Sequence, residues 1–301
     1  MARLADALQR ANRRREDLDG AHDSPVVVEP PPLAVKSRAP DRIAPGPGHT
    51  PLLDFSPGQS SLTNWRTDPE LVGKLVGTDN VSSGALEQYR KLAATLHHAQ
   101  AERGIQVVMT ASSLPGEGKS LTAVNLALTL SESYHRRVLL IDADLRRPTV
   151  QRLFGLTTLH GLDEGLKSEH DRAMPIVQLS ERLFVLPAGR PDPDPLSGLT
   201  SERMQRLVHQ AKSAFDWVVI DTPPVTLLPD ANLLATCVDG VLLVVRAGKT
   251  PFQLVKRTVD TLGHARILGV VMNAVDYAHD RNAGGYYEYY GYGYHGVSKG
   301  K

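Results

Sequence analysis

Residues 105–120 read IQVVMTASSLPGEGKS, and the order of residue types in this segment is the strongest indication of the fold. It begins as a run of apolar and β-branched residues, which is typical of a buried strand. It ends in two glycines, a lysine and a serine, and the following residues LTAVNLALTLSES have helical character. A strand, a glycine-rich loop and a helix in this order predict a phosphate-binding loop.

The loop SLPGEGKS (113–120) contains the residue types that phosphate binding requires. Gly116 and Gly118 let backbone N–H groups approach phosphate oxygens without a side-chain clash. The helix N-terminus adds unsatisfied N–H groups and a partial positive charge. Lys119 is expected to reach the β- and γ-phosphates, and the Ser120 hydroxyl is expected to bind magnesium. Ser113 stands where this pattern usually has its first glycine.

Strands and helices alternate after residue 104. The helical stretches lie near 119–133, 201–214 and 252–263. The apolar runs between them are nearly continuous, which is expected when both faces of a parallel sheet are covered. We therefore predict an α/β fold with a doubly wound, mostly parallel sheet. The predicted strands contain residues 107–109, 138–141, 183–186, 217–220, 241–245 and 267–272.

Two of these runs end in carboxylates. VLLIDADLRRP places Asp142 and Asp144 at one strand end, and WVVIDTPP places Asp221 at another. The carboxyl ends of parallel strands face the ligand crevice of an open sheet, so these acids are predicted to lie beside the loop. On a continuing strand, Asp142 and Asp144 would point to the same face. Arg146 and Arg147 follow them, either to contact phosphates or to pair with carboxylates.

Bulk properties exclude several other classes. The chain has 301 residues and a formal net charge of +1, which gives no argument for nucleic acid as a partner. Cys237 is the one cysteine, so an internal disulfide is excluded, and we expect a small buried apolar residue there. The sequence has neither an apolar run long enough to span a bilayer nor a signal-peptide core. We therefore expect a cytoplasmic protein.

Four segments are predicted along the chain. Residues 1–20 are expected to form a short basic helix, and residues 21–80 a proline-rich flexible linker. The phosphate-binding domain is expected over 81–276, with an amphipathic helix over 84–102 at its start. Residues 277–301 are expected to form a flexible tail rich in tyrosine and glycine.

Together, the motifs SLPGEGKS, VLLIDADLRRP and VVIDTPP resemble those of the bacterial tyrosine kinases (BY-kinases). The resemblance covers about residues 84–294 and is greatest to the standalone tyrosine autokinases of exopolysaccharide loci. It implies a P-loop NTPase fold of the SIMIBI/MinD-like type. It also implies autophosphorylation with ATP, and a role in controlling the chain length and export of exopolysaccharide or capsule.

The resemblance implies roles for individual residues, with ATP and Mg²⁺ as cofactors. Asp142 and Asp144 divide metal binding and activation of the tyrosine hydroxyl between them, in an order that the sequence leaves open. Lys119, Asp142, Asp144 and Asp221 form the catalytic set. Ser120, Asp142, Asp144 and Asp221 form the metal set. The nucleotide-binding set is Pro115, Gly116, Glu117, Gly118, Lys119, Ser120, Leu121 and, beyond the last strand, Asn273, which is placed to contact adenine.

The tail carries a cluster of tyrosines that fits this resemblance. A low-complexity tail that adheres to partners is the simpler interpretation of the cluster by itself. Next to a kinase site, the cluster is predicted to be the phosphate acceptor. The predicted autophosphorylation sites are Tyr286, Tyr287, Tyr289, Tyr290, Tyr292 and Tyr294.

The resemblance also implies partners. The family phosphorylates in trans within a ring, which an E-x-x-R-x-x-R helix motif supports. Here Glu87 and Arg90 fit that motif, but Ala93 replaces its second arginine, so the pair is either part of an oligomer interface or a simple surface pair. An inner-membrane chain-length determinant (polysaccharide co-polymerase) is the implied partner and would hold the protein at the membrane. A tyrosine phosphatase is the implied antagonist.

Two other functions fit parts of the sequence. A ParA/MinD-type ATPase switch shares the fold, but such proteins carry an extra lysine early in the loop, where this chain has Leu114. A non-catalytic nucleotide-binding regulator of an export complex would use the proline-rich segment and the tail. The complete set of carboxylates argues against that regulator.

Overall fold

The computed structural model describes residues 52–54, 74–76, 81–156, 160–168 and 173–275. All of them belong to one compact unit within Ala44–Lys301. The predicted N-terminal helix, most of the predicted linker and the tail with its six tyrosines lie outside the described residues. Among the described helices, none is long and apolar enough to cross a membrane.

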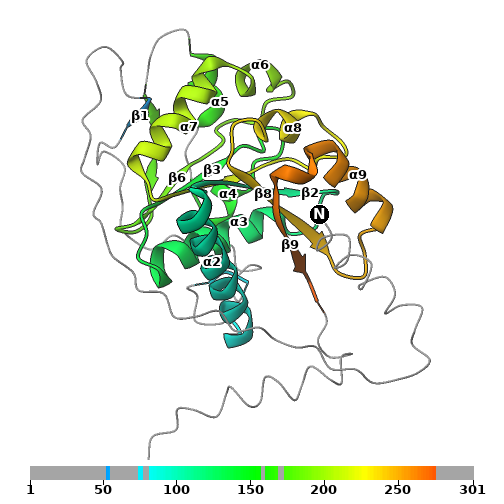
Figure 1. Ribbon diagram of the computed structural model, residues 1–301. Coiled ribbons are helices and arrows are strands. Elements are labelled where there is room, and N and C mark those ends of the chain that lie inside the picture. Colours follow the sequence, from blue (N-terminus) through cyan, green and yellow to red (C-terminus); the bar gives the residue numbers. More distant parts are fainter. Residues whose placement is uncertain (1–51, 55–73, 77–80, 157–159, 169–172, 276–301) are drawn as a thin grey trace, which may run out of the picture. The chain divides into compact units, whose positions relative to one another are not determined.

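The elements follow the predicted alternation of strands and helices (Figure 1). The strands are β1 (Leu53–Asp54), β2 (Val107–Ser112), β3 (Val138–Asp142), β4 (Met174–Pro175), β5 (Val177–Gln178), β6 (Leu183–Leu186), β7 (Trp217–Asp221), β8 (Gly240–Arg246) and β9 (Ile267–Asn273). The α-helices are α2 (Ser83–Arg103), α3 (Lys119–Leu128), α4 (Val150–Leu153), α5 (Leu162–Lys167), α6 (Leu196–Leu199), α7 (Glu202–Ala214), α8 (Asp230–Leu234) and α9 (Phe252–Leu262). A π-helical turn η2 (Thr129–Ser133) extends α3, and a 3-10 turn η3 (His264–Arg266) precedes β9.

Seven strands form the main sheet in the order β5-β6-β3-β7-β2-β8-β9. All neighbours are parallel except β5, which pairs antiparallel with β6 at one edge. The six predicted strands are therefore confirmed. The short strands β1, β4 and β5 were not predicted, since each has only two residues and no readable periodicity.

Helices cover both faces of the sheet because side chains alternate along each strand. Val107 and Met109 of β2 join a core that also contains Met204 and Leu207 of α7. Val108 points to the other face, into a core that includes Leu96 of α2 and residues of α3. Figure 1 shows α2 and α3 on one side of the sheet and α6 and α7 on the other. The predicted doubly wound sheet is confirmed.

Helix α2 has well-defined caps at both ends. The Ser82 side chain accepts a hydrogen bond from the Ala85 N–H at 3.2 Å, and Gly104 ends the helix with φ 69°. Leu96 is fully buried on the predicted apolar face. Leu86, Tyr89 and Leu92 are partly buried against the same core, so one face of the predicted amphipathic helix packs on the domain.

Two short stretches inside the predicted linker are ordered parts of this unit. Leu53 of β1 pairs with Met174 of β4 in parallel and is 1% exposed. The Val76 N–H donates to the Asn125 side chain of α3 at 2.8 Å. The linker prediction therefore does not describe residues 52–54 and 74–76, because their apolar side chains are buried in the two hydrophobic cores of the domain.

Candidate active site

Three neighbouring strands end at one level of the sheet and bring the site together. Asp142 at the end of β3 is the pairing partner of Asp221 at the end of β7. Asp221 is in turn paired with Thr110, near the end of β2. The phosphate-binding loop leaves β2 two residues later, so parallel register by itself places both acids beside the loop, as the sequence predicted.

The loop runs from the end of β2 to Lys119, the first residue of α3. Gly116 and Gly118 have φ values of 77° and 94°, in the left-handed region that favours glycine. A Cβ at Gly118 would lie 1.9 Å from the Asn273 side-chain nitrogen, whereas one at Gly116 would meet nothing within 4 Å. Gly118 is therefore required for both conformation and space.

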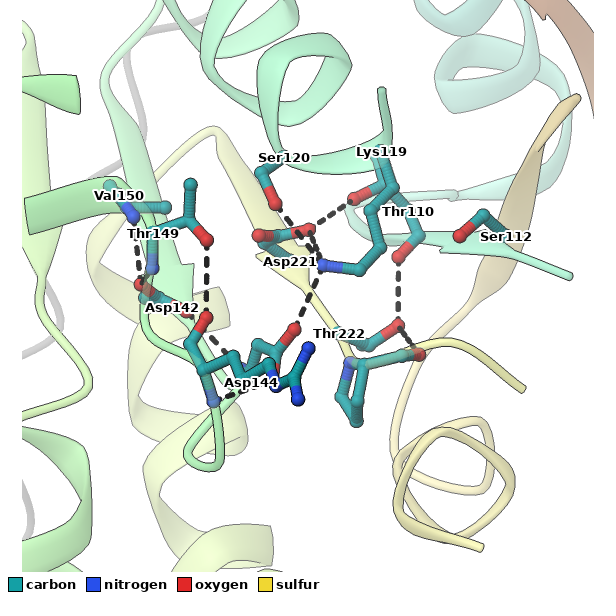
Figure 2. Close-up of polar contacts among 12 residues, drawn as sticks. Thr110, Ser112, Lys119, Ser120, Asp142, Asp144, Thr149, Val150, Asp221 and Thr222 are labelled. Carbon is teal, nitrogen blue, oxygen red and sulfur yellow. Dashed lines mark hydrogen bonds and ion pairs between the residues drawn. The ribbon is translucent and has the colours of Figure 1, made fainter. Parts of the chain in front are cut away.

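Lys119 lies between two acids (Figure 2). Its Nζ is 3.0 Å from Asp144 Oδ2 and 3.6 Å from Asp221 Oδ1, and it also donates to the Ser120 hydroxyl at 3.1 Å. Burial by itself lowers the pKa of Lys119, but the charges of Asp221 and Asp144 outweigh burial and raise it. The lysine is therefore a fixed positive charge beside the phosphate cradle.

Asp142 is fully buried and held by backbone N–H groups (Figure 2). Its Oδ2 accepts from Thr149 and Val150, each at 2.9 Å, and its Oδ1 accepts from the Asp144 N–H at 3.2 Å. Burial and the nearby Asp221 raise the pKa of Asp142 to about 7, against the lowering effect of those N–H groups and of Lys119. This carboxyl therefore gains or loses a proton near neutral pH.

Asp221 is also fully buried, and burial raises its pKa against the lowering effect of Lys119. Its Oδ1 faces Lys119, but its Oδ2 is buried without a hydrogen-bond partner among the described residues. A buried oxygen without a partner is costly unless a ligand, a metal ion or water binds it. Asp221 Oδ2 is thus a natural acceptor for a metal ion or for its bound water.

Asp144 reaches the site by a different route from the one predicted. Strand β3 ends at Asp142, so the same-face argument for a continuing strand does not apply. The chain turns after Asp142, and Asp144 Oδ1 accepts the Arg147 N–H at 3.1 Å. This turn directs Asp144 Oδ2 to Lys119. Lys119 therefore contacts Asp144 from a loop and Asp221 from a strand end.

A divalent cation fits this set only together with a nucleotide. Within the part of the chain that the structure describes, no three acidic, histidine or cysteine side chains form a metal cluster. Magnesium is usually bound through one or two carboxylates plus substrate phosphates. The Ser120 hydroxyl and Asp221 Oδ2 supply such a partial set, whereas Asp142 already accepts three backbone N–H groups.

Arg146 settles one alternative left open by the sequence. Its guanidinium binds both carboxylate oxygens of Asp230, at 2.8 and 3.3 Å, and also donates to the Pro193 carbonyl. Arg146 therefore forms an ion pair with a carboxylate, and this pair connects the loop after β3 to α8. Helix α8 begins at Asp230 itself, and the side chain of Asp230 binds Arg146.

Ser113 has partners that its sequence position did not predict. Its hydroxyl lies 2.8 Å from that of Thr258 in α9, and both residues are fully buried. The Ser113 carbonyl accepts from the Thr226 hydroxyl. The serine at the usual glycine position therefore ties the loop to α9. A hydroxyl on the buried face of an amphipathic helix, such as that of Thr258, requires a hydrogen-bond partner. This requirement is the sequence signal that could have predicted the contact.

The remaining predicted residues lie at several places. Asn273, at the end of β9, donates from Nδ2 to the Glu117 carbonyl at 2.8 Å and so contacts the phosphate loop directly. Leu121 is partly buried against the core that contains α3, while Pro115 is exposed. Glu87 and Arg90 form an exposed pair on α2, with 3.8 Å between Oε2 and Nη1.

Comparisons with known proteins identify the family of this chain. Residues 104–297 match the family described as "ParA: NUBPL iron-transfer P-loop NTPase". Tyrosine-protein kinase YwqD of Bacillus subtilis (strain 168) is 37% identical over 190 residues, covering 62% of this chain and 80% of that protein. Tyrosine-protein kinase wzc of Salmonella typhimurium is 31% identical over 231 residues, covering 75% of this chain but only 31% of that protein.

Solved structures give the same result. The kinase domain of Escherichia coli tyrosine kinase ETK has a TM-score of 0.63 and 30% identity, covering 71% of this chain and 83% of that domain. The P-loop NTPase fold implies a bound nucleotide with a divalent metal ion. The named kinases favour a tyrosine kinase over a ParA/MinD-type switch. The chain belongs to the bacterial tyrosine-protein kinases, a family built on the ParA-like P-loop fold.

Proposed function

We propose that this chain transfers the γ-phosphoryl group of ATP to tyrosines of its own C-terminal tail, Tyr286, Tyr287, Tyr289, Tyr290, Tyr292 and Tyr294. The phenolic oxygen attacks the γ-phosphorus, the bond to the β–γ bridging oxygen breaks, and ADP leaves. The phenol gives up its proton, so that phosphotyrosine, ADP and one proton are the products. The observation that carries the proposal is the meeting of Lys119, Asp144 and Asp221 at the phosphate loop.

The chain's own groups have distinct tasks in this reaction. The loop amides from Gly116 to Ser120 bind and orient the phosphates, and Lys119 offsets the negative charge that moves during transfer. A bound magnesium ion would supply positive charge that offsets the negative charge of the phosphates. Ser120 and Asp221 are the proposed protein ligands of that ion, with Asp142 and Asp144 close behind them.

A phenol has a pKa of about 10, so it needs a proton acceptor near neutral pH. Asp142 has a pKa of about 7, which suits proton transfer better than an ordinary carboxyl does. Asp144 is less buried and lies beside Lys119, where it can orient the acceptor. We therefore propose Asp142 as the proton acceptor, acting through a water molecule, and Asp144 as its partner.

The test is mass spectrometry of the purified full chain after incubation with Mg-ATP. We expect phosphate on several tail tyrosines and none in the Lys119→Met variant, which keeps the loop but lacks the positive charge. A tail that stays unmodified in the unsubstituted protein, with nucleotide bound, would leave a non-catalytic regulator as the better description.

The cellular setting is proposed from the relatives alone. We propose a cytoplasmic protein held at the inner membrane by a chain-length determinant (polysaccharide co-polymerase), controlling exopolysaccharide or capsule export. A homo-oligomer would allow one subunit to phosphorylate the tail of another, and a tyrosine phosphatase would reverse the reaction. The corresponding test is co-purification of the untagged chain with that membrane protein. From membranes that lack the membrane protein, washing without detergent should remove the chain.

A further inference from the structure

Glu117 is a buried acid in the middle of the phosphate loop. It is 3% exposed, although its neighbours Pro115 and Gly116 are exposed. Its Oε2 accepts the Leu114 N–H at 2.9 Å, so the side chain closes a turn within the loop. Its Oε1 accepts from the Thr250 hydroxyl, which lies more than a hundred residues further along the chain.

Thr250 belongs to the turn between β8 and α9 and is itself held in place. Its Oγ1 accepts the Arg246 N–H at 3.1 Å while donating to Glu117, and its own N–H donates to the Arg246 carbonyl at 3.1 Å. The hydroxyl thus has a fixed position at the end of β8. The Glu117 side chain is anchored to the sheet through it.

The backbone of Glu117 is fixed from another strand. Its carbonyl accepts from Asn273 at the end of β9, and the same amide leaves no room for a side chain at Gly118. Both ends of Glu117 are therefore held by the last β-α-β unit of the sheet. A phosphate loop works only when its N–H groups point to one centre, which requires a fixed loop shape.

We propose that Glu117 is a positioning residue that sets the shape of the phosphate loop through Thr250. The Glu117 carboxylate accepts hydrogen bonds from the Thr250 hydroxyl and the Leu114 N–H. The N–H groups that follow in the loop therefore stay available to bind phosphates. The inference rests on the proposed nucleotide site. It adds a role for the Glu117 side chain, which positions the loop without contacting the substrate.

The test compares Thr250→Val with Thr250→Ser in the full chain. Binding of Mg-ADP is measured by calorimetry, and KM for ATP and kcat by phosphotyrosine formation. We expect Thr250→Val to raise Kd and KM about tenfold, the size of a lost hydrogen bond to a charged group, with kcat changed much less. Thr250→Ser keeps the hydroxyl and restores most of the affinity. Thr261→Val, on the exposed side of α9, is the matched control.

A second pair of variants separates geometry from folding. Glu117→Gln can still accept from Leu114 and donate to Thr250, so its Kd should lie closer to that of the unsubstituted chain than the Kd of Glu117→Ala does. Glu117→Ala combined with Thr250→Val should lose no more affinity than the larger single loss, because both act on one contact. If Thr250→Val does not fold, these Glu117 variants decide the matter by themselves.

The outcomes are distinct. Normal Mg-ADP affinity in Thr250→Val, or fully additive losses in the double variant, overturns the positioning role while leaving the kinase function intact. Failure of the unsubstituted chain to bind Mg-ADP overturns both. Phosphate on the tail of the unsubstituted chain together with equal KM values in Thr250→Val and Thr261→Val overturns the positioning role alone.

Discussion

The folded protein disfavours the ionised form of Asp142. Its pKa of about 7 lies above the value of about 3.9 expected in an unfolded chain, so the folded state holds the proton more tightly. Stability contributed by that proton is present at low pH and is lost as pH rises from about 4 to about 7. At neutral pH the ionised form of Asp142 is therefore unfavourable, and a bound metal ion would offset that negative charge.

The prediction concerns Asp142→Asn, which cannot ionise. Between pH 4 and 7 its free energy of unfolding should fall less steeply with pH than that of the unsubstituted chain, by up to about 1.4 kcal/mol per pH unit. Urea unfolding at pH 5 and pH 8 measures the difference. Parallel profiles for the two proteins would mean that another group carries the raised pKa.

The sequence identified the individual residues of the site but missed the residues that form hydrogen bonds and ion pairs with them. The loop, its lysine and the three acids were predicted from local motifs, and the structure brings them together. The Thr149 and Val150 N–H groups that hold Asp142, and the Asp230 side chain that binds Arg146, come from segments whose own motifs carry no functional pattern. Partners of that kind depend on three-dimensional packing.

Among the elements, α9 is coupled to the phosphate loop by a pair of buried hydroxyls, Ser113 and Thr258. Ser113→Gly would restore the usual loop residue, yet we expect it to destabilise the protein by about 1–3 kcal/mol, because Thr258 would lose its partner. Urea unfolding measures the loss. Adding Thr258→Val should recover much of it, since both polar groups are then absent. Full stability in Ser113→Gly alone would contradict this coupling.

The predicted elements were those with a continuous apolar run or a clear helical pattern. Runs such as 138–141 and 217–220 became β3 and β7 because continuous apolar residues have few other ways to be buried. The order of the strands was beyond the sequence, since β7 lies between β3 and β2 only through long-range pairing. The π-helical turn at Thr129–Ser133 was likewise hidden, because the sequence predicted a single helical stretch over 119–133.

For the whole molecule, the prediction is that phosphorylation loosens assembly. Each phosphotyrosine adds about −1.5 to −2 charges, so several on one tail would repel those of neighbouring subunits. Size-exclusion chromatography of the phosphorylated and phosphatase-treated chain should give a smaller species for the former, with the difference reduced at high salt. Identical elution of both forms would contradict the prediction. Glu87→Ala and Arg90→Ala test whether α2 takes part.

The position of β7 in the middle of the sheet has a consequence for synthesis. β2 and β3 emerge from the ribosome long before β7, yet they are neighbours of β7 and not of each other. A nascent chain that ends before residue 217 therefore holds a phosphate loop without the strand that bears Asp221. Completion of the ATP site awaits insertion of that late strand between two early ones.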